Sequence, residues 1–173
     1  MRLLLALSLA SLVPASAFAV GQDEASLSLG AGFTVEHQGE SRPGAAVELR
    51  LLRGLSDAWA ARLGLQAALA PSSSGRSAAS VLSQAAGFTW AVDIVNWVPF
   101  LDLGLLAADA RGGGHGASQR LGVEAGLGID YLFSRRTVAS ILGRVDYLPL
   151  RLAGTDSPRP VVASFVLHLG RSF

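Results

Sequence analysis

The feature that most constrains this chain is a regular alternation of apolar and polar residues. Between 161 and 173 the odd positions are mainly large and apolar, whereas the even positions include Ser164, His168 and Gly170. The segments 121–133, 59–69, 27–35 and 47–51 repeat the pattern, and weaker alternation occupies 82–94, 99–109 and 137–147. A period of two is typical of strands with one apolar face. Because no apolar run of about 18 residues follows the N-terminal segment, a transmembrane helix is not predicted.

The alternation predicts an all-β chain of eight strands. We expect them near 25–37, 44–53, 58–70, 80–94, 98–109, 119–133, 137–148 and 160–173. Most reach the length of about 9–11 residues with which a tilted strand crosses a membrane. The connections alternate between long ones (37–43, 71–79, 110–118, 149–159) and tight ones (54–57, 95–97, 134–136). An even strand number with alternating connections favours an antiparallel up-and-down transmembrane β-barrel with short periplasmic turns and longer extracellular loops.

Charged residues support this reading because parity places them on the face opposite the apolar one. On the apolar face, charges occur only near strand ends, at Arg53, Asp109 and Arg171. An Arg at the lipid-facing midplane would cost about 2–4 kcal/mol. The opposite face is predicted to carry a polar network inside the barrel, made of Glu48, Arg50, Arg62, Asp102, Glu124, Asp130, Arg144, Asp146 and His168. Asp93 lies nearer a strand end.

Glycines share that inner face and leave room for the charged side chains. By parity they are Gly30, Gly32, Gly64, Gly104, Gly122, Gly126, Gly128 and Gly170. The interior of an eight-stranded barrel is just wide enough for side chains to fill. Buried charges need partners, so we predict a paired, side-chain-filled core in preference to a conducting pore.

Aromatic residues gather at the strand ends that the tight connections join. They are Trp59, Trp97, Tyr131, Phe133 and Phe173, and Tyr147 falls at the opposite rim. Aromatic rings form girdles where a barrel meets the membrane interface, so the sequence predicts a periplasmic girdle.

The N-terminus has the pattern of a secretory signal peptide. Arg2 is followed by an apolar run over 3–13 and by the small-residue site Ala17-Phe18-Ala19. We therefore expect a signal peptide at 1–19 and one mature domain at 20–173. The mature segment has 13 Arg and 13 acidic residues, so nothing attracts it to nucleic acid. The absence of cysteine from the 173 residues excludes a disulfide scaffold and a thiolate metal site.

With these features the chain resembles the small eight-stranded outer-membrane barrels of Gram-negative bacteria, of the outer membrane protein X type and the type of the transmembrane domain of outer membrane protein A. The most specific element is the C-terminal strand that ends in Phe173, with Phe165, Leu167 and Leu169 at alternate positions. In that family the terminal strand is an assembly signal. The resemblance therefore implies a monomer in the bacterial outer membrane, surrounded by lipid and lipopolysaccharide and inserted by the barrel-assembly machinery.

These observations favour a non-catalytic outer-membrane protein with a structural or surface-interaction role and no cofactor or metal. The alternatives are a small channel for ions or hydrophobic solutes, a lipid A-modifying enzyme and a secreted soluble ligand-binding barrel of the lipocalin type. An enzyme would need a Ser and a base within hydrogen-bond reach, and His37, His115 and His168 lie in no recognisable catalytic pattern. The loop arginines suit phosphorylated lipopolysaccharide head groups; they are Arg42, Arg76, Arg111, Arg151 and Arg159.

Overall fold

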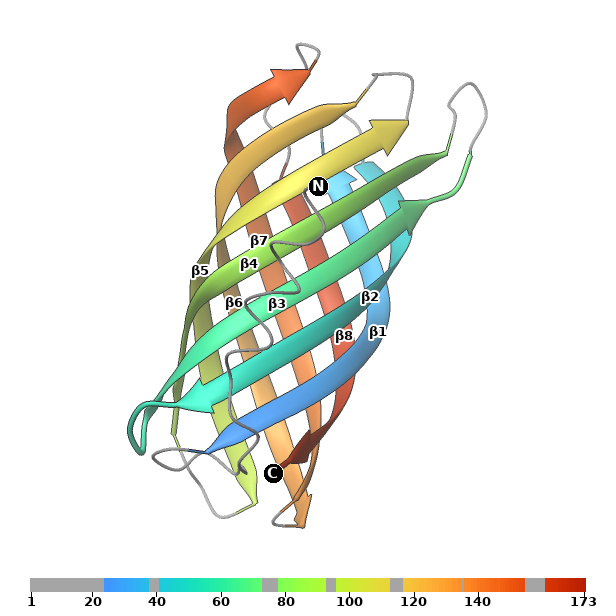
Figure 1. Ribbon diagram of the computed structural model, residues 1–173. Coiled ribbons are helices and arrows are strands. Elements are labelled where there is room, and N and C mark those ends of the chain that lie inside the picture. The colour runs from blue at the N-terminus through green and yellow to red at the C-terminus, as the bar shows by residue number, and fades with distance from the viewer. Residues whose placement is uncertain are drawn as a thin grey trace.

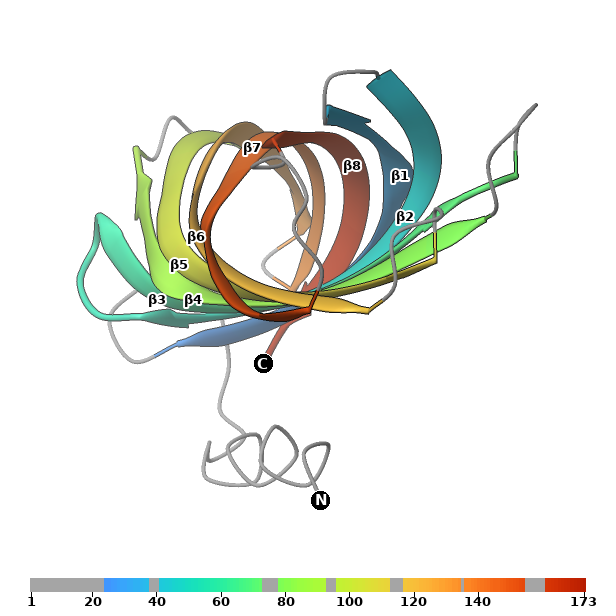
Figure 2. The ribbon, with the colours of Figure 1, turned by 90° about the horizontal axis from the view of Figure 1, so that it is seen from above.

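The computed structural model is a closed barrel of eight antiparallel strands (Figures 1 and 2). It describes residues 24–37, 41–72, 78–92, 96–112, 117–134, 136–154 and 161–173. The strands are β1 (Ala25–His37), β2 (Ser41–Gly54), β3 (Trp59–Ala70), β4 (Ala79–Ala91), β5 (Trp97–Gly112), β6 (Ser118–Ser134), β7 (Thr137–Gly154) and β8 (Val161–Ser172). Each strand pairs with the next, and β8 returns to pair with β1. The predicted fold class is confirmed.

The strands have 12 to 18 residues, so every one is long enough to cross a membrane at a tilt. Within the described ranges, no helix is long and apolar enough to cross a membrane. The predicted signal peptide at 1–19 lies outside the described residues.

Four strands are longer than predicted (β2, β5, β6 and β7), and in β2 and β7 the added residues include a proline. β2 begins at Ser41 and includes Pro43, whereas the prediction began at 44. β7 continues past Pro149 to Gly154, whereas the prediction ended at 148. Both prolines lie at a sheet edge, because β2 pairs with β3 only from Ala45 and β7 pairs with β8 only as far as Tyr147. At an edge, a missing N–H group removes no ladder hydrogen bond on the open side.

The predicted contrast in connection length is only partly present. We call the end of the barrel at which the chain terminates, with Phe173, its C-terminal end. At this end the strands are joined by 55–58, 92–96 and 135–136, and at the other end by 38–40, 71–78, 113–117 and 155–160. The first connection, expected at 37–43, is therefore as short as a tight turn. The reason is that β1 and β2 keep pairing up to His37 and Ser41, so strand replaces the expected loop. In β5 and β7 the strands end at Gly112 and Gly154, whose φ angles of 85° and 106° favour glycine.

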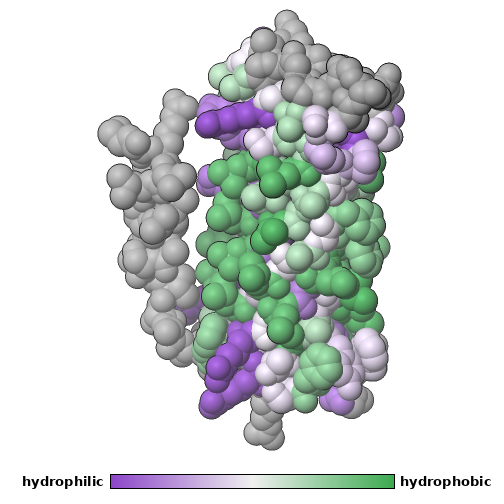
Figure 3. All heavy atoms as spheres, turned by 90° about the vertical axis from the view of Figure 1, so that its right-hand side faces the viewer, coloured by the Kyte–Doolittle hydropathy of each residue, from purple (hydrophilic) through white to green (hydrophobic). Residues whose placement is uncertain are grey.

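The barrel is inverted relative to a soluble protein. The odd-numbered apolar residues of β1 and β3 are exposed, as Leu29 (60%) and Leu69 (63%) illustrate, whereas charged Glu48 and Asp102 have no exposed surface at all. Figure 3 shows one face, on which hydrophobic side chains form a band between two more hydrophilic ends. The prediction of which face carries the charge is confirmed, and the soluble lipocalin-type alternative, which would bury the apolar face, is wrong.

Candidate functional site

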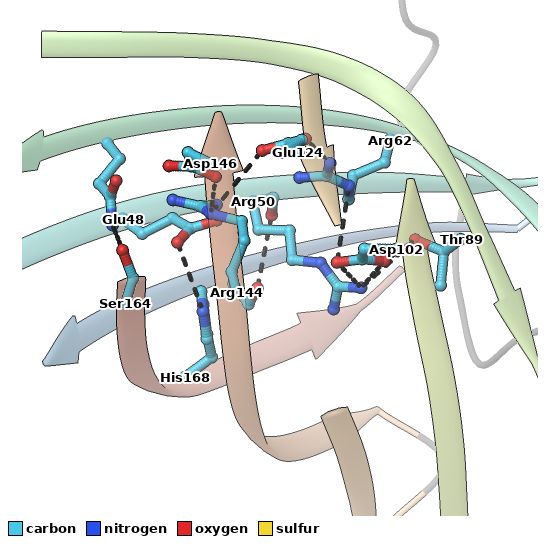
Figure 4. A network of polar contacts seen from close by, with 12 residues as sticks. Glu48, Arg50, Arg62, Thr89, Asp102, Glu124, Arg144, Asp146, Ser164 and His168 are labelled. Carbon is cyan, nitrogen blue, oxygen red and sulfur yellow. Dashed lines mark hydrogen bonds and ion pairs between the residues drawn. The ribbon is translucent and has the colours of Figure 1, made fainter. Parts of the chain in front are cut away.

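The interior of the barrel holds a network of buried charges contributed by six of the strands, and Figure 4 shows how these side chains point toward one another. Its members are Glu48 and Arg50 on β2, Arg62 on β3, Asp102 on β5, Glu124 on β6, Arg144 and Asp146 on β7, and His168 on β8. All have 4% or less of their surface exposed. The parity of the strands brings these residues together because every one of them points away from the apolar band.

One half of the network centres on Asp102. Arg50 Nη2 donates to both carboxylate oxygens of Asp102, at 3.0 and 3.2 Å, and the Thr89 hydroxyl donates to Oδ1 at 2.5 Å. Arg62 Nε lies 3.6 Å from Asp102 Oδ2. The Arg50 guanidinium also lies 4.4 Å from the centroid of the Phe100 ring, a cation–π contact. Asp102 is therefore held by two cations and a hydroxyl.

The other half centres on Arg144. Its Nη1 donates to Glu48 Oε1 at 2.9 Å, and its Nε lies 3.1 Å from Asp146 Oδ1 and 3.7 Å from Glu124 Oε2. Arg62 also contacts Glu124, so it joins the two halves. Charges this deeply buried are tolerated only because each has an oppositely charged partner.

His168 and the inward glycines complete the packing. His168 Nε2 lies 4.0 Å from Glu48 Oε2, while nearby Ser164 accepts a hydrogen bond from Gln66 at 3.5 Å. A Cβ added at Gly30 would lie 2.6 Å from the His168 ring, and one at Gly104 would lie 2.7 Å from Glu124 Oε1. These glycines provide the space that the network occupies, as their parity suggested.

Apolar layers lie on both sides of the charges. On β5, Val98 and Phe100 precede Asp102, and Leu106 and Ala108 follow it. Towards the C-terminal end of the barrel the first pair packs with Ala91 and Leu142, and towards the other end the second pair packs with Leu148. Above the network there is a cavity of about 30 Å³, room for little more than a water molecule. The lumen is therefore filled by side chains in three layers.

Two further charged residues lie in the interior. Arg120 is buried (5% exposed) and donates to the Leu148 carbonyl at 3.4 Å. Its inward position could have been predicted, because it shares the parity of Gly122 on the same strand. Asp130 is buried as well and lies near the end of β6, opposite Val98 and Ser140, where it interacts electrostatically with Arg50. Asp93 lies outside the described residues.

The aromatic residues lie at the C-terminal end of the barrel. The ring centroids of Trp97 and Tyr131 are 4.6 Å apart, and those of Tyr131 and Phe133 are 4.8 Å apart. Trp59 pairs across the strands with Trp90, which the prediction left out because it extended this strand to 94. Phe173 is exposed, as are Phe165, Leu167 and Leu169 of β8. The girdle thus contains one tryptophan more than expected.

Among the residues that the structure describes, one Ser–His contact involves a histidine considered for catalysis. His37 Nδ1 lies 3.3 Å from Ser41 Oγ, at the exposed turn from β1 to β2. His168 contacts Glu48 and not Ser164, and His115 lies outside the described residues. In the part of the chain that the structure describes, no group of three acidic or histidine side chains is placed to hold a metal ion.

No protein-family model matches this sequence, and no curated protein matches it. Solved structures do. Neisserial surface protein A (NspA) has a TM-score of 0.75 at 12% identity, over 86% of this chain and 97% of that one. OprG of Pseudomonas aeruginosa has a TM-score of 0.58 at 13% identity, over 90% of this chain and 99% of that one. Ail, the attachment invasion locus protein of Yersinia pestis, has a TM-score of 0.56 at 14% identity, over 88% of this chain and 99% of that one.

The outer membrane enzyme PagL is also similar, with a TM-score of 0.51 at 16% identity over 84% of this chain and 97% of that one. Enzymes and other proteins thus share this architecture, and at such identities the likeness shows the fold alone. The chain has the fold of the small eight-stranded outer-membrane β-barrels.

Proposed function

We propose that this chain is an integral outer-membrane β-barrel protein with a closed interior and a structural or surface-interaction role. One observation carries the proposal: apolar side chains cover the outside of the barrel, while the charged residues are paired inside it. In a lipid bilayer this arrangement satisfies the backbone through closed strand pairing and exposes mainly apolar groups to the acyl chains. Export by the signal peptide and insertion by the barrel-assembly machinery belong to the same proposal.

Electrophoretic mobility tests the proposal directly. Outer-membrane fractions from cells that express the chain would be run in SDS with and without boiling. A closed barrel resists SDS because its strand pairing has no edge from which to open, so we expect a band whose mobility shifts on boiling. A single unshifted band in the soluble periplasmic fraction would contradict the proposal.

The surface-interaction role is supported by the upper part of β7. In this segment Leu150, Arg151, Ala153 and Gly154 pair with β6, and the described pairing of β7 with β8 ends at Tyr147. Leu150 and Leu152 on this segment are each 61% exposed. A strand end with exposed apolar side chains suits a partner that adds a strand. Substituting Pro for Leu152 should weaken binding to any such partner while the heat-dependent mobility stays unchanged.

The channel alternative is disfavoured by the layered interior. Conduction needs a continuous polar path, whereas here apolar layers containing Phe100 and Leu106 lie on either side of the charges. Planar-bilayer recordings of the purified barrel should therefore show a flat trace. Discrete conductance steps that disappear with the protein would overturn this part of the proposal.

We also propose that the barrel has no catalytic activity. The contact between His37 and Ser41 is the observation that most favours an enzyme, but a triad needs a third group that orients the base. The Glu36 carboxylate precedes His37 in β1 and so points to the opposite face. Mass spectrometry of lipid A from cells with and without the chain should show identical acylation. A difference that Ser41→Ala abolishes would establish the enzyme instead.

A further inference from the structure

The outer wall formed by β4 to β7 carries a polar residue where the rest of the wall is apolar. Gln84 is exposed and points outward between Leu82 and Ala86. It lies six residues along β4 from Trp90 of the girdle, which is about 15 Å up the wall for a tilted strand. That height is inside the apolar band. Within the described residues its carboxamide has no side-chain hydrogen-bond partner, and such a group in hydrocarbon costs several kcal/mol.

The wall beneath Gln84 is hollow. A depression of about 520 Å³ lies between the strands, bordered by Leu63, Leu105, Leu121, Val123 and Leu150. Ala86 and Ala107 line the depression and carry only methyl groups, so the wall is recessed here. It is much larger than the cavity in the interior, so this surface has room for a chain-like apolar ligand.

A second depression, of about 360 Å³, continues upward and shares Gln84 and Ala107 with the first. Here the border becomes polar, with Asp109, Arg111 and Gln119. Arg111 pairs with Asp109 through two hydrogen bonds, from Nε to Oδ1 at 3.3 Å and from Nη2 to Oδ2 at 3.5 Å, and Gln119 Nε2 also donates to Oδ2 at 3.4 Å. The Arg111 side chain remains 73% exposed. Since a guanidinium has five N–H donors, it keeps donors free for an anion.

We propose that this continuous groove binds a membrane lipid that has an anionic phosphate head group. One acyl chain would lie in the lower depression, the Gln84 amide would hydrogen-bond the ester linkage, and Arg111 would bind the phosphate. The order of the groove from apolar to amide to cation matches the order of groups along such a lipid. The inference rests on the proposed function, since it requires the wall to face a membrane.

A second copy of the chain fits the groove less well. A twofold dimer would place one hollow against the other and leave the recess that Ala107 lines unfilled. A lipid chain is narrow enough to fill the hollow and supplies carbonyl groups for the amide.

Native mass spectrometry of the refolded barrel tests the proposal. The protein in neutral detergent would be titrated with phosphatidylglycerol and, separately, with phosphatidylcholine of identical acyl chains. We expect one bound phosphatidylglycerol and weaker binding of phosphatidylcholine. Heat-dependent mobility of the same sample shows whether the barrel has folded, so failure of the proposed function is distinguishable from failure of the lipid site.

Three variants locate the lipid. Ala107→Phe fills the groove and should reduce binding more than tenfold. Gln84→Leu should reduce binding of both lipids about three- to tenfold, the effect of one hydrogen bond. Arg111→Ala should lower phosphatidylglycerol binding to the phosphatidylcholine level. The matched control is Ala31→Phe, at an exposed alanine on the wall of β1, which should bind as the wild type does.

Three outcomes would overturn the proposal: equal binding of the two lipids, unchanged binding in Ala107→Phe, or a lipid-free dimer that Gln84→Leu dissociates. If Ala107→Phe fails to fold, Gln84→Leu and Arg111→Ala still decide. Both residues are exposed on the outer wall, so a folded protein with unaltered binding in both variants also refutes the lipid site.

Discussion

The interior and the outer wall of this barrel both contain polar residues, but these residues differ in whether they have protein partners. Inside, Arg62 and Arg144 each contact two or more carboxylates, and the cavity above them has a volume of about 30 Å³. On the wall, Gln84 has no protein partner in the described part of the chain and borders a depression of about 520 Å³. The charges of the interior find oppositely charged partners within the barrel, whereas the wall carries the groove for which we propose a lipid. Polarity therefore serves stability in one region and recognition in the other.

The largest expected effect is the loss of a charge that joins both halves of the interior. Arg62→Met leaves Asp102 and Glu124 buried with one cation fewer. Removing one partner from a buried ion pair typically costs about 3–5 kcal/mol, and we expect a loss of that size in the free energy of unfolding. Urea unfolding in lipid vesicles measures it. If the loss is below about 1 kcal/mol, the interior network is not what stabilises the barrel.

The next prediction concerns a charge placed on the wall. Leu127→Arg puts a guanidinium near the middle of β6 on the lipid face, where Leu127 is 69% exposed. We expect a destabilisation of about 2–4 kcal/mol. The matched control is Phe133→Arg, on the same face at the end of the same strand, where the cost should fall to about 0–1 kcal/mol from the charge itself. Equal costs at the two depths would contradict a membrane around the wall.

Adding one methyl group, by replacing a glycine with alanine, should destabilise the packed interior but not the open wall. Gly104→Ala places a Cβ 2.7 Å from Glu124 Oε1 and 2.9 Å from the Ala86 carbonyl, so we expect a loss of about 1–3 kcal/mol. Gly143→Ala is the control, because Gly143 points outward and its Cβ would meet nothing closer than 3.9 Å. Thermal unfolding of the two variants in the same detergent should differ in this direction. Similar midpoints would mean that the interior tolerates extra volume.

Much of this architecture was predictable because side chains of a strand alternate strictly. Once the face of Glu124 was assigned, Gly122 and Gly126 had to share it. The partners within the interior were not predictable: Glu48 and Arg144 are 96 positions apart in sequence and meet only because β8 closes on β1. The predicted end of β7 was wrong for a local reason. Proline usually ends a strand, but Pro149 lies at a sheet edge, where the strand continues through it.

The groove on the wall could not be predicted from the alternation of residues either. Parity shows that Gln84 faces outward, but not that Ala107 lies beside it or that the two share a depression with Leu150. These neighbours depend on strand register and on the irregularity of β6–β7 pairing near Pro149. Residue type along one strand contains no information about either.

The smallest expected effect on stability comes from the rim of the groove, and it separates recognition from folding. Arg111 pairs with Asp109 while 73% of its side chain is exposed, and such pairs contribute about 0–1 kcal/mol. Arg111→Ala should therefore leave the urea midpoint almost unchanged while it removes the preference for phosphatidylglycerol. Arg111→Lys, which keeps the charge but not the planar fork of donors, should retain part of that preference. A large loss of stability in Arg111→Ala would instead make this arginine structural, and the division between a self-sufficient interior and a ligand-dependent wall would no longer hold.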